Sequence, residues 1–366
     1  MGREHWRGII EAYRHLLPID PQTPVITLFE GNTPLVASRT VGSRIKRDVW
    51  FKVEGANPTG SFKDRGMTVA VSRAMQASSR GVICASTGNT AASAAAYAAR
   101  AGLPCVVIVP AGGVAAGKLV QTLAHGATVV AVDGTFDQAG ALARKAAVQF
   151  DLTSVNSINP DRIHGQQTVA WEICDTMGEA PDLVALPVGN AGNITALWQG
   201  FRAYHGREVI HRLPRLIGMQ AAGAAPLVEG RVIPEPRTLA SAIRIGNPAS
   251  WQKAVDAAKA SGGVFHAVDD SEILEAQRLL AEEEGVFAEP ASAAGLAGVM
   301  RRLRSSRRAT LNGGGEGCHG WTTQRTRRQV QRSVRFCPSG CSDSARWGRT
   351  CTGYCRMRHL WPLAPA

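Results

Sequence analysis

The chain has 366 residues, of which 45% are hydrophobic and 19% are charged, a composition typical of folded globular proteins and not of disordered ones. The first twenty residues carry charges from the start, and no run of eighteen apolar residues follows, so the sequence predicts neither a signal peptide nor a membrane span. We therefore expect a cytoplasmic protein of one or two domains.

The formal net charge of +12 comes from the C-terminal part alone. Residues 301–366 contain 14 Arg, no Lys and two acidic residues, whereas basic and acidic residues balance over residues 1–300. The charge of the body therefore gives no indication of a nucleic-acid or membrane partner, and we expect neither.

The first chemically informative segment is EGANPTGSFKDRG, residues 54–66. A proline and a glycine shape a turn, and the following residues predict a helix that begins near Ser61, with Ser61 as its N-cap. The positive end of the helix dipole disfavours the ammonium form of Lys63, and a neutral amine can attack an aldehyde. A solvated surface lysine is the alternative for this segment alone. Asp64 and Arg65 are interpreted as charges that fix the loop.

From residue 81 the sequence alternates apolar strands with helical stretches. The predicted strands are 81–86, 104–110 and 128–134, and the predicted helices are 90–102, 115–127 and 135–150. A second set begins at 182–206 and continues through 214–227 to an acidic helix at 269–285. Continuous apolar strands that alternate with helices indicate parallel sheets covered by helices. Cys84, Cys105 and Cys174 lie in apolar or helical stretches, which predicts reduced core residues.

Polar residues follow the first of these strands, in CASTGNTAAS at 84–93. Ser86, Thr87, Asn89 and Thr90 offer hydroxyls and an amide at the carboxyl end of a strand, where open α/β sheets bind ligands. The segment suits a carboxylate, a phosphate or a phenolic oxygen. Ordinary helix capping is the alternative, but the number of polar groups exceeds what one cap needs.

Two further segments could bind anions. In SVNSINPDRIHGQ, residues 154–166, Asn156, Ser157 and Arg162 could bind one anion, with a polar surface loop as the alternative. In PVGNAGNITALW, residues 187–198, small residues between a strand and a helix could form an anion cradle, although such a turn can also be purely structural.

Taken together, these segments resemble the threonine synthases, a family of pyridoxal-phosphate enzymes. The resemblance spans residues 5–300 and includes EGNTPL, KVEGANPTGSFKDRGM, CASTGNTAASAAAYAARAG, VNSINPDRIHGQ, LPVGNAGNITA, QAAGAAPL, AIRIGNPASW and EGVFAEPASAAGLAG. The lysine motif is shared with serine/threonine dehydratases and cysteine synthases, so a pyridoxal-phosphate-dependent dehydratase is the alternative function.

The resemblance implies an α/β fold of type II, with two open, twisted, mostly parallel sheets flanked by helices and the cofactor in the cleft between two domains. The larger domain, which binds the cofactor phosphate, would comprise residues 1–55 and 153–303. The smaller α/β domain would comprise residues 56–152. A homodimer is also implied.

The implied reaction is that of a carbon–oxygen lyase, which converts O-phospho-L-homoserine and water to L-threonine and phosphate. Lys63 would hold pyridoxal phosphate covalently and then move protons, while Asn89 would hydrogen-bond the cofactor's 3′ oxygen. The implied site contains no metal. The residues implied to bind the cofactor phosphate are Gly189, Asn190, Ala191, Gly192 and Asn193. Those implied to bind the substrate are Thr90, Asn156, Ser157 and Arg162 at its phosphate and Ser86 near its carboxylate.

The sequence departs from the family pattern after about residue 303. Neither helical nor strand periodicity continues, and Thr310, Thr322 and Thr323 match no motif for the threonine that contacts the cofactor's pyridine nitrogen. Residues 304–366 could be a basic extension that binds nucleic acid, or an out-of-frame translation of a GC-rich gene. They could also form a zinc site from the C-x₃-C-x₉-C-x₃-C spacing of Cys337, Cys341, Cys351 and Cys355. We favour the out-of-frame interpretation, because the segment has Arg without Lys, and we expect it to impair activity.

Overall fold

The computed structural model describes residues 5–111 and 116–311 of the chain. Helix α13 runs from Pro290 to Leu311, so helical structure continues beyond the predicted change of pattern at residue 303. The predicted zinc cysteines and the rest of the basic tail lie outside the described residues.

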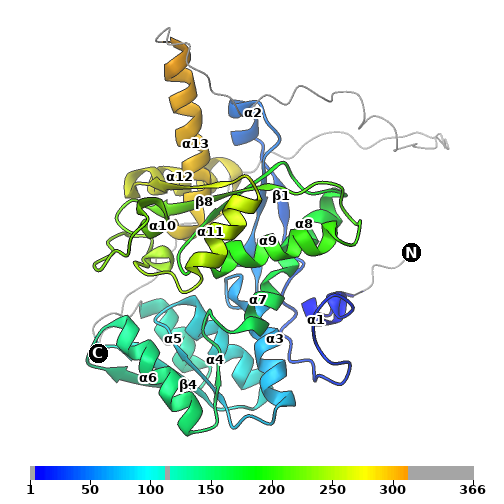
Figure 1. Cartoon of the computed structure of the whole chain (residues 1–366), viewed down its shortest axis with the longest axis vertical. Helices are drawn as coiled ribbons and strands as arrows, with labels where there is room; N and C mark the ends of the chain where they lie inside the picture. The colour runs from blue at the N-terminus through cyan, green and yellow to red at the C-terminus, as the bar shows by residue number, and fades with distance from the viewer. Residues whose placement is uncertain (1–4, 112–115, 312–366) are drawn as a thin grey trace, which may run out of the picture. The chain divides into compact units, whose positions relative to one another are not determined.

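The first half of the chain forms a four-stranded parallel sheet with the strand order β5-β4-β3-β6. Its strands are β3 (Val82–Ala85), β4 (Cys105–Pro110), β5 (Thr128–Val132) and β6 (Thr153–Ser154). The helices around it are α3 (Lys63–Gln76), α4 (Asn89–Ala101), α5 (Ala116–Ala124) and α6 (Phe136–Gln149). Figure 1 shows α4, α5 and α6 grouped around β4. Because β6 pairs with β3, this sheet extends two residues past the boundary predicted at residue 152.

Burial explains why these segments form their elements. All four residues of β3 are buried, as expected for a central parallel strand covered on both faces. The alanine-rich helix α4 packs against it and ends at Gly102, which adopts a φ of 67°. Thr135 and Gln138 form a capping box at the start of α6. Cys84, Cys105 and Cys174 are free and buried, which confirms that they are reduced core residues.

The second half of the chain forms a three-stranded parallel sheet in the order β7-β8-β9. Its strands are β7 (Leu183–Pro187), β8 (Arg215–Ala221) and β9 (Val264–Val268). The longer helices of this half are α8 (Thr168–Met177), α9 (Gly192–His205), α11 (Trp251–Ala260), α12 (Asp270–Glu284) and α13. The two sheets and their helices confirm the predicted α/β class.

Several short elements complete the described fold. They are α1 (Ile9–Tyr13), β1 (Leu35–Ala37), α2 (Val41–Ile45), β2 (Trp50–Lys52), η1 (Glu54–Ala56), α7 (Pro160–Gln166), α10 (Pro226–Glu229) and η2 (Ser241–Ile243). Strands β1 and β2 pair antiparallel in a small separate sheet. Helix α7 lies directly before α8 in the chain and packs on α3, which brings the segment of Arg162 against the segment of Lys63.

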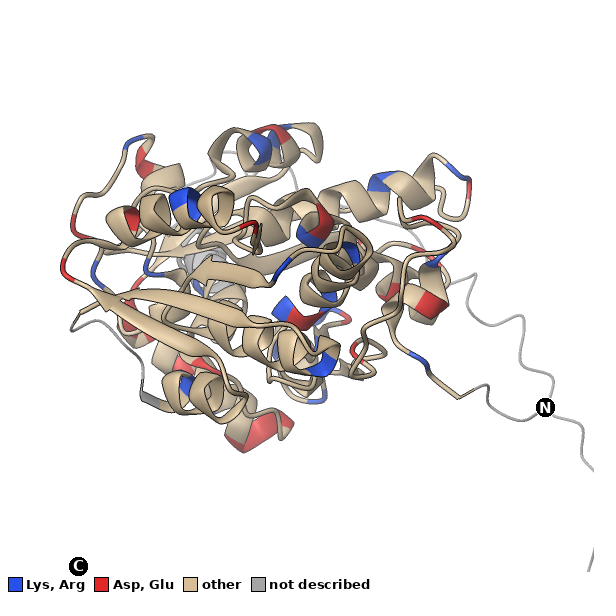
Figure 2. Ribbon diagram, turned by 90° about the horizontal axis from the view of Figure 1, so that it is seen from below, with Lys and Arg blue, Asp and Glu red and all other residues tan. Residues whose placement is uncertain are grey.

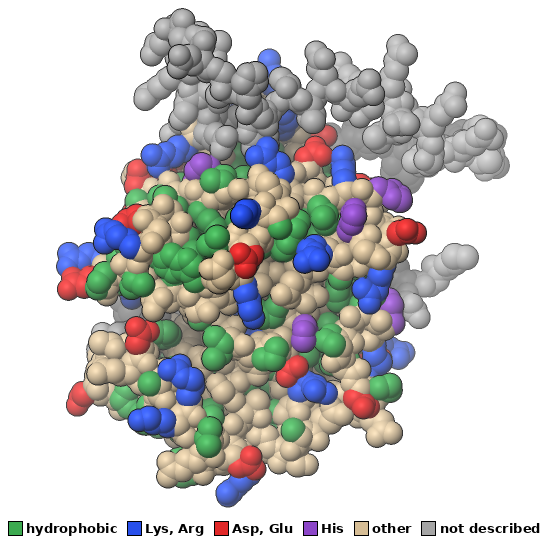
Figure 3. Space-filling view, in the orientation of Figure 1, with side chains coloured by type: hydrophobic (Ala, Val, Ile, Leu, Met, Phe, Trp, Pro, Cys, Tyr) green, Lys and Arg blue, Asp and Glu red, His purple; other side chains and the backbone are tan. Residues whose placement is uncertain are grey.

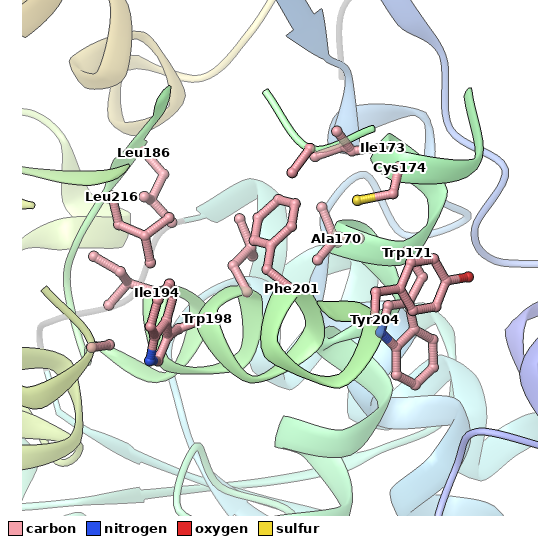
Figure 4. Packing of buried hydrophobic residues seen from close by; sticks show 14 of the residues in the cluster. Ala170, Trp171, Ile173, Cys174, Leu186, Ile194, Trp198, Phe201, Tyr204 and Leu216 are labelled. Carbon is pink, nitrogen blue, oxygen red and sulfur yellow. The ribbon is translucent and has the colours of Figure 1, made fainter. Parts of the chain in front are cut away.

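Helix α9 occupies the centre of the largest hydrophobic cluster (Figure 4). Its residues Ile194 and Trp198 lie beside Leu186 of β7 and Leu216 of β8, so the helix covers that sheet. At its other end the ring of Tyr204 stacks on Trp171 of α8, with 5.7 Å between the ring centroids. This packing fixes the N-terminal end of α9, which the predicted anion cradle at 189–193 leads into.

Charged residues of both signs are distributed over the described elements, as Figure 2 shows. On the face drawn in Figure 3, basic, acidic and hydrophobic side chains are interspersed. This distribution agrees with the balanced charge of residues 1–300. Within the described ranges, the structure contains no helix that is long and apolar enough to cross a membrane.

Candidate active site

The turn before Lys63 is fixed by the buried carboxylate of Asp64. The backbone N–H and hydroxyl of Thr59 donate to it at 2.7 and 2.6 Å, and the hydroxyl of Ser93 donates at 2.6 Å. Burial raises the pKa of Asp64, although these three hydrogen bonds oppose the shift. Since Ser93 lies on α4 and Thr59 lies in the turn, Asp64 joins three segments around the lysine.

Arg65 is completely buried and anchors the same helix to two other parts of the fold. Its guanidinium forms a bidentate pair with Glu54 at 2.7 and 2.9 Å and another with Glu172 at 2.6 and 2.8 Å. Lys52 also donates to Glu172, at 2.7 Å. These contacts confirm that Asp64 and Arg65 are charges that fix the loop.

Lys63 is the first residue of α3, and its side chain is partly buried. Its Nζ lies 4.2 Å from the centroid of the Phe62 ring. Burial, together with the nearby Arg162 guanidinium, lowers the pKa of Lys63 to about 7, while Glu289 acts in the opposite direction. At neutral pH a substantial fraction of the amine is therefore unprotonated.

The predicted helix start needs a correction. The residue assigned as the N-cap of α3 is Phe62, one position after Ser61, and the Phe62 side chain makes no cap hydrogen bond. The Ser61 hydroxyl instead accepts a hydrogen bond from the Lys63 N–H at 3.3 Å. The helix therefore begins one residue later than predicted, and the turn before it passes through Gly60, whose φ is 83°.

Two glycines bring the helix of Arg162 against the helix of Lys63. A Cβ on Gly66 of α3 would lie 2.6 Å from the carbonyl oxygen of Arg162, and a Cβ on Gly165 of α7 would lie 2.0 Å from the carbonyl oxygen of Arg65. Both positions therefore require glycine for the two backbones to approach this closely. This contact leaves no signal in the local sequence, because nothing near either glycine marks the two as partners.

The guanidinium of Arg162 is completely buried and only partly satisfied. Its Nη1 donates to the Val155 carbonyl at 3.1 Å, whereas Nε and Nη2 have no partner among the described residues. Burial lowers the pKa of Arg162 to about 10, and Cys84 and Asp64 oppose the shift. Because an unpaired buried cation is costly, these two free donor groups indicate a site that an anionic ligand completes.

The polar segment after β3 lies at the start of α4. The Ser86 hydroxyl accepts from the Gly88 N–H at 3.2 Å, and Thr90 is buried in the first turn of the helix. The Asn89 Nδ2 donates to both carboxylate oxygens of Glu289, at 3.3 and 3.4 Å. The Oδ1 of Asn89 is buried and has no described partner.

The two predicted ligands before α7 have different surroundings. The Asn156 side chain forms two hydrogen bonds with the backbone of Ala85. Its Oδ1 accepts from the Ala85 N–H at 3.2 Å, and its Nδ2 donates to the Ala85 carbonyl at 3.0 Å. This pairing continues the contact between β3 and the segment after β6 and gives Asn156 a structural function. The backbone of Ser157 instead approaches Gly192, since a Cβ on that glycine would lie 3.7 Å from the Ser157 carbonyl oxygen.

The predicted cradle at 189–193 forms the turn between β7 and α9. Ala191 is the N-cap of α9 and has a left-handed φ of 64°. Asn190 is tied down, because its side chain and carbonyl accept from the N–H groups of Ala249 and Ser250. The Oδ1 of Asn193 is buried without a described partner. The turn thus has a fixed backbone and one unsatisfied polar atom.

Glu289 is a site residue to which sequence analysis assigned no role. It lies immediately before α13, contacts Asn89 and acts electrostatically on Lys63. The available signal was its position in EGVFAEPASAAGLAG, one of the segments that carry the resemblance. Its contact with Asn89 joins residues 200 positions apart in the chain, so no local pattern could pair them.

The model of the pyridoxal-phosphate dependent enzyme family matches residues 26–313. The chain belongs to this family. It is 57% identical to threonine synthase of Synechocystis sp. over 299 aligned residues. The aligned residues cover 81% of this chain and 78% of that protein. Threonine synthase of Mycobacterium tuberculosis is 55% identical over 299 residues, with 81% and 83% covered. That of Halalkalibacterium halodurans is 53% identical over 300 residues, with 82% and 84% covered.

Solved structures of the family share the fold. Maize serine racemase superposes with a TM-score of 0.68 at 23% identity, covering 82% of this chain and 89% of that chain. A T.th. threonine deaminase superposes with a TM-score of 0.64 at 26% identity, covering 76% and 89%. Both support the predicted type II fold.

The residues around Lys63 fit pyridoxal phosphate, the cofactor of this family. Lys63 supplies an amine that is partly neutral at pH 7, which a covalent link to an aldehyde requires. The Oδ1 atoms of Asn89 and Asn193 are buried without a described partner, and as acceptors they can receive a hydrogen bond only from a group that carries a proton, not from a phosphate oxygen. Gly189 to Asn193 form a strand-to-helix turn of small residues, a common phosphate-binding arrangement. We take these as the residues that would hold the cofactor.

Proposed function

We propose that the chain is a threonine synthase, which converts O-phospho-L-homoserine and water to L-threonine and phosphate. The observation that carries the proposal is the environment of Arg162, a buried cation that acts electrostatically on Lys63 and has two donor groups without a partner among the described residues. A substrate with its own phosphate would complete this site. The sequence identity to threonine synthases supports the same substrate.

Lys63 is proposed to bind the cofactor and to move protons. Pyridoxal phosphate, when bound, supplies an electron sink for breaking carbon–hydrogen bonds near the substrate's amino group. The pKa of about 7 suits Lys63 for both proton removal and proton return, because the amine is present in both forms near neutral pH. Asn89 and the turn from Gly189 to Asn193 are proposed to orient the cofactor.

The substrate is proposed to bind through its phosphate and its carboxylate. Arg162, Ser157 and Thr90 would hold the phosphate, and Ser86 would lie near the carboxylate. Asn156 is included among the proposed ligands, and its hydrogen bonds to Ala85 support a further role in holding the loop that carries Ser157.

Phosphate release from O-phospho-L-homoserine tests the proposal. We expect Lys63→Ala to abolish release and Arg162→Ala to lower kcat/KM by roughly 100-fold or more, because the phosphate would lose a bidentate partner. Arg73→Ala is the matched control, since Arg73 lies on α3 with 41% of its side chain exposed and its ion pair to Asp161 spans 3.8 Å. Circular dichroism would verify that each variant is folded.

The same assay separates the dehydratase alternative. A serine/threonine dehydratase would release a 2-oxo acid from serine or threonine and would keep that activity in Arg162→Ala. If O-phospho-L-homoserine releases no phosphate while threonine yields a 2-oxo acid, the proposed function is wrong.

We also propose that residues 304–366 are an out-of-frame translation that lowers activity. The support is compositional, namely fourteen Arg and no Lys over residues 301–366. DNA sequencing of a fresh isolate and the intact mass of its protein would test this. The proposal fails if the same tail is encoded and the protein has the 38.8 kDa mass of this sequence.

Three further proposals concern the oligomeric state, the location in the cell and the domain boundaries. We propose a homodimer in the cytoplasm, with the resemblance as its support. We also propose two domains, with residues 1–55 and 153–303 forming the larger and 56–152 the smaller. Light scattering of the purified chain would measure its oligomeric state, and limited proteolysis would show whether cleavage concentrates near residues 55 and 152.

A further inference from the structure

Glu289 comes from a distant part of the chain, contacts Asn89 near Lys63, and is held in place by the start of helix α13. Its backbone carbonyl accepts from the Ser292 N–H at 3.0 Å, in the first turn of α13. Helix α13 packs closely on β7, since a Cβ on Gly295 would lie 3.1 Å from the Ala185 carbonyl oxygen. The carboxylate is therefore presented to Asn89 by a fixed helix start, although Glu289 itself is exposed.

Asn89 depends on this carboxylate for its orientation. Its Nδ2 donates to both Oε1 and Oε2 of Glu289, at 3.3 and 3.4 Å. This arrangement leaves the Oδ1 buried and without a described partner. An amide that can rotate about its last bond is positioned only when one of its two ends is held.

The charges around Lys63 give Glu289 a second effect. Arg162 on α7 disfavours the ammonium form of Lys63, and Glu289 favours it. On the lysine's own helix, the Asp64 carboxylate is engaged by hydroxyl and N–H donors, and Arg65 is paired with two carboxylates. Among the described residues, Glu289 is therefore the carboxylate whose charge opposes that of Arg162 at this lysine.

We propose that Glu289 is a positioning residue that holds the Asn89 amide and supplies the negative charge that opposes Arg162 at Lys63. In this role Glu289 acts through the side chains of Asn89 and Lys63. The inference rests on the proposed function only where it assigns Lys63 and Asn89 to the cofactor.

The charge effect can be measured on the full chain before cofactor is added. Competitive acetylation with acetic anhydride across pH 5–10, read by mass spectrometry of the peptide that contains Lys63, gives the titration midpoint of that amine. In Glu289→Gln the glutamine oxygen can still accept from Asn89, but the charge is lost. We expect the midpoint to fall by about 0.5 pH unit or more. Glu282→Gln removes an exposed charge from α12 and should leave it unchanged.

The positioning effect is measured by binding of pyridoxal phosphate, followed by fluorescence. Glu289→Ala should weaken binding by about 3- to 10-fold, because Asn89 loses its partner. In a chain that already carries Asn89→Ala, Glu289→Ala should weaken the binding of pyridoxal phosphate by less than about twofold. The reason is that the amide that Glu289 holds is already absent. Glu289→Gln should bind nearly as well as the unmodified chain.

Two results would overturn the proposal. One is a Lys63 midpoint that stays in place or rises in Glu289→Gln. The other is an equal loss of cofactor affinity from Glu289→Ala with and without Asn89, which a purely structural role would give. Neither measurement uses substrate, and acetylation uses no cofactor, so failure of the threonine synthase assay leaves both results interpretable.

Discussion

At the scale of single residues, the main feature is a lysine whose protonated form is disfavoured in the folded chain. Lys63 has its pKa lowered from 10.5 to about 7 by burial and by Arg162. Between these two values the unfolded chain holds a proton that the folded chain has lost, so the stability of the fold rises with pH across this window. Below pH 7 the full unfavourable effect of the buried ammonium is present.

Replacing this lysine should therefore stabilise the chain in a pH-dependent way. Lys63→Met, measured without cofactor, should raise the free energy of unfolding at pH 6 by about 1–3 kcal/mol, a discounted value because the amine is only partly buried. The gain should shrink as pH rises from 7 to 10.5. Urea unfolding at pH 6, 8 and 10 measures it, and a gain that is constant with pH would contradict the assigned shift.

At the scale of elements, the site depends on the contact between α3 and α7. Gly66 and Gly165 let the two backbones meet, and this contact places Arg162 beside Lys63. Side chains at either position would separate the helices and displace the cation from the lysine. The position of Arg162 next to Lys63 thus depends on glycine at both of these positions.

Alanine at this contact should be poorly tolerated. Gly165→Ala would place a Cβ 2.0 Å from the Arg65 carbonyl oxygen, and we expect it to lower the free energy of unfolding by about 2–4 kcal/mol. Gly140→Ala is the matched control, because its Cβ would only meet Arg144 at 3.6 Å within α6. It should be neutral or stabilising by up to about 1 kcal/mol. Similar losses in both variants would argue against the helix contact.

The elements themselves were largely predictable, since local patterns encode them. Every strand and helix expected between residues 81 and 150 is present within a few residues of its predicted bounds. The candidate site was predicted as segments but not as contacts. The partners of Glu289, the use of Asn156 to bind Ala85, and the Gly66–Gly165 approach each depend on residues that are distant in the sequence. Such pairings are decided by tertiary packing and leave no periodic signal.

At the scale of the whole molecule, Arg65 connects segments that are far apart in the chain. It bonds Glu54 of η1, Glu172 of α8 and the Thr33 hydroxyl before β1. Burial raises the pKa of Glu172, but the hydrogen bonds and charges of Arg65 and Lys52 outweigh burial and leave the pKa below its usual value. The stability from this carboxylate is present above pH 4.5 and is lost as the pH falls further.

Removing the central cation should destabilise the fold and make it more acid-sensitive. Arg65→Met leaves two carboxylates without their main partner, and we expect a loss of about 3–5 kcal/mol at pH 7. Since Glu172 would then protonate at a higher pH, acid unfolding should begin at a higher pH as well. Urea and acid titrations followed by circular dichroism measure both effects. Arg73→Ala, with its exposed and loose ion pair, should change stability by less than about 0.5 kcal/mol.

Two donor groups of Arg162 have no partner in the described part of the chain, and this has a consequence for the choice of buffer. Under the proposed function, inorganic phosphate is a product that fits the same guanidinium, so it should bind the folded chain and not the unfolded one. At about 100 times its dissociation constant, such a ligand adds about 2.7 kcal/mol to the free energy of unfolding. Phosphate buffer should therefore raise the melting temperature, measured against Arg162→Lys and a chloride control. Phosphate from the same buffer would also compete with the substrate at Arg162, so the measured activity of the enzyme would be too low.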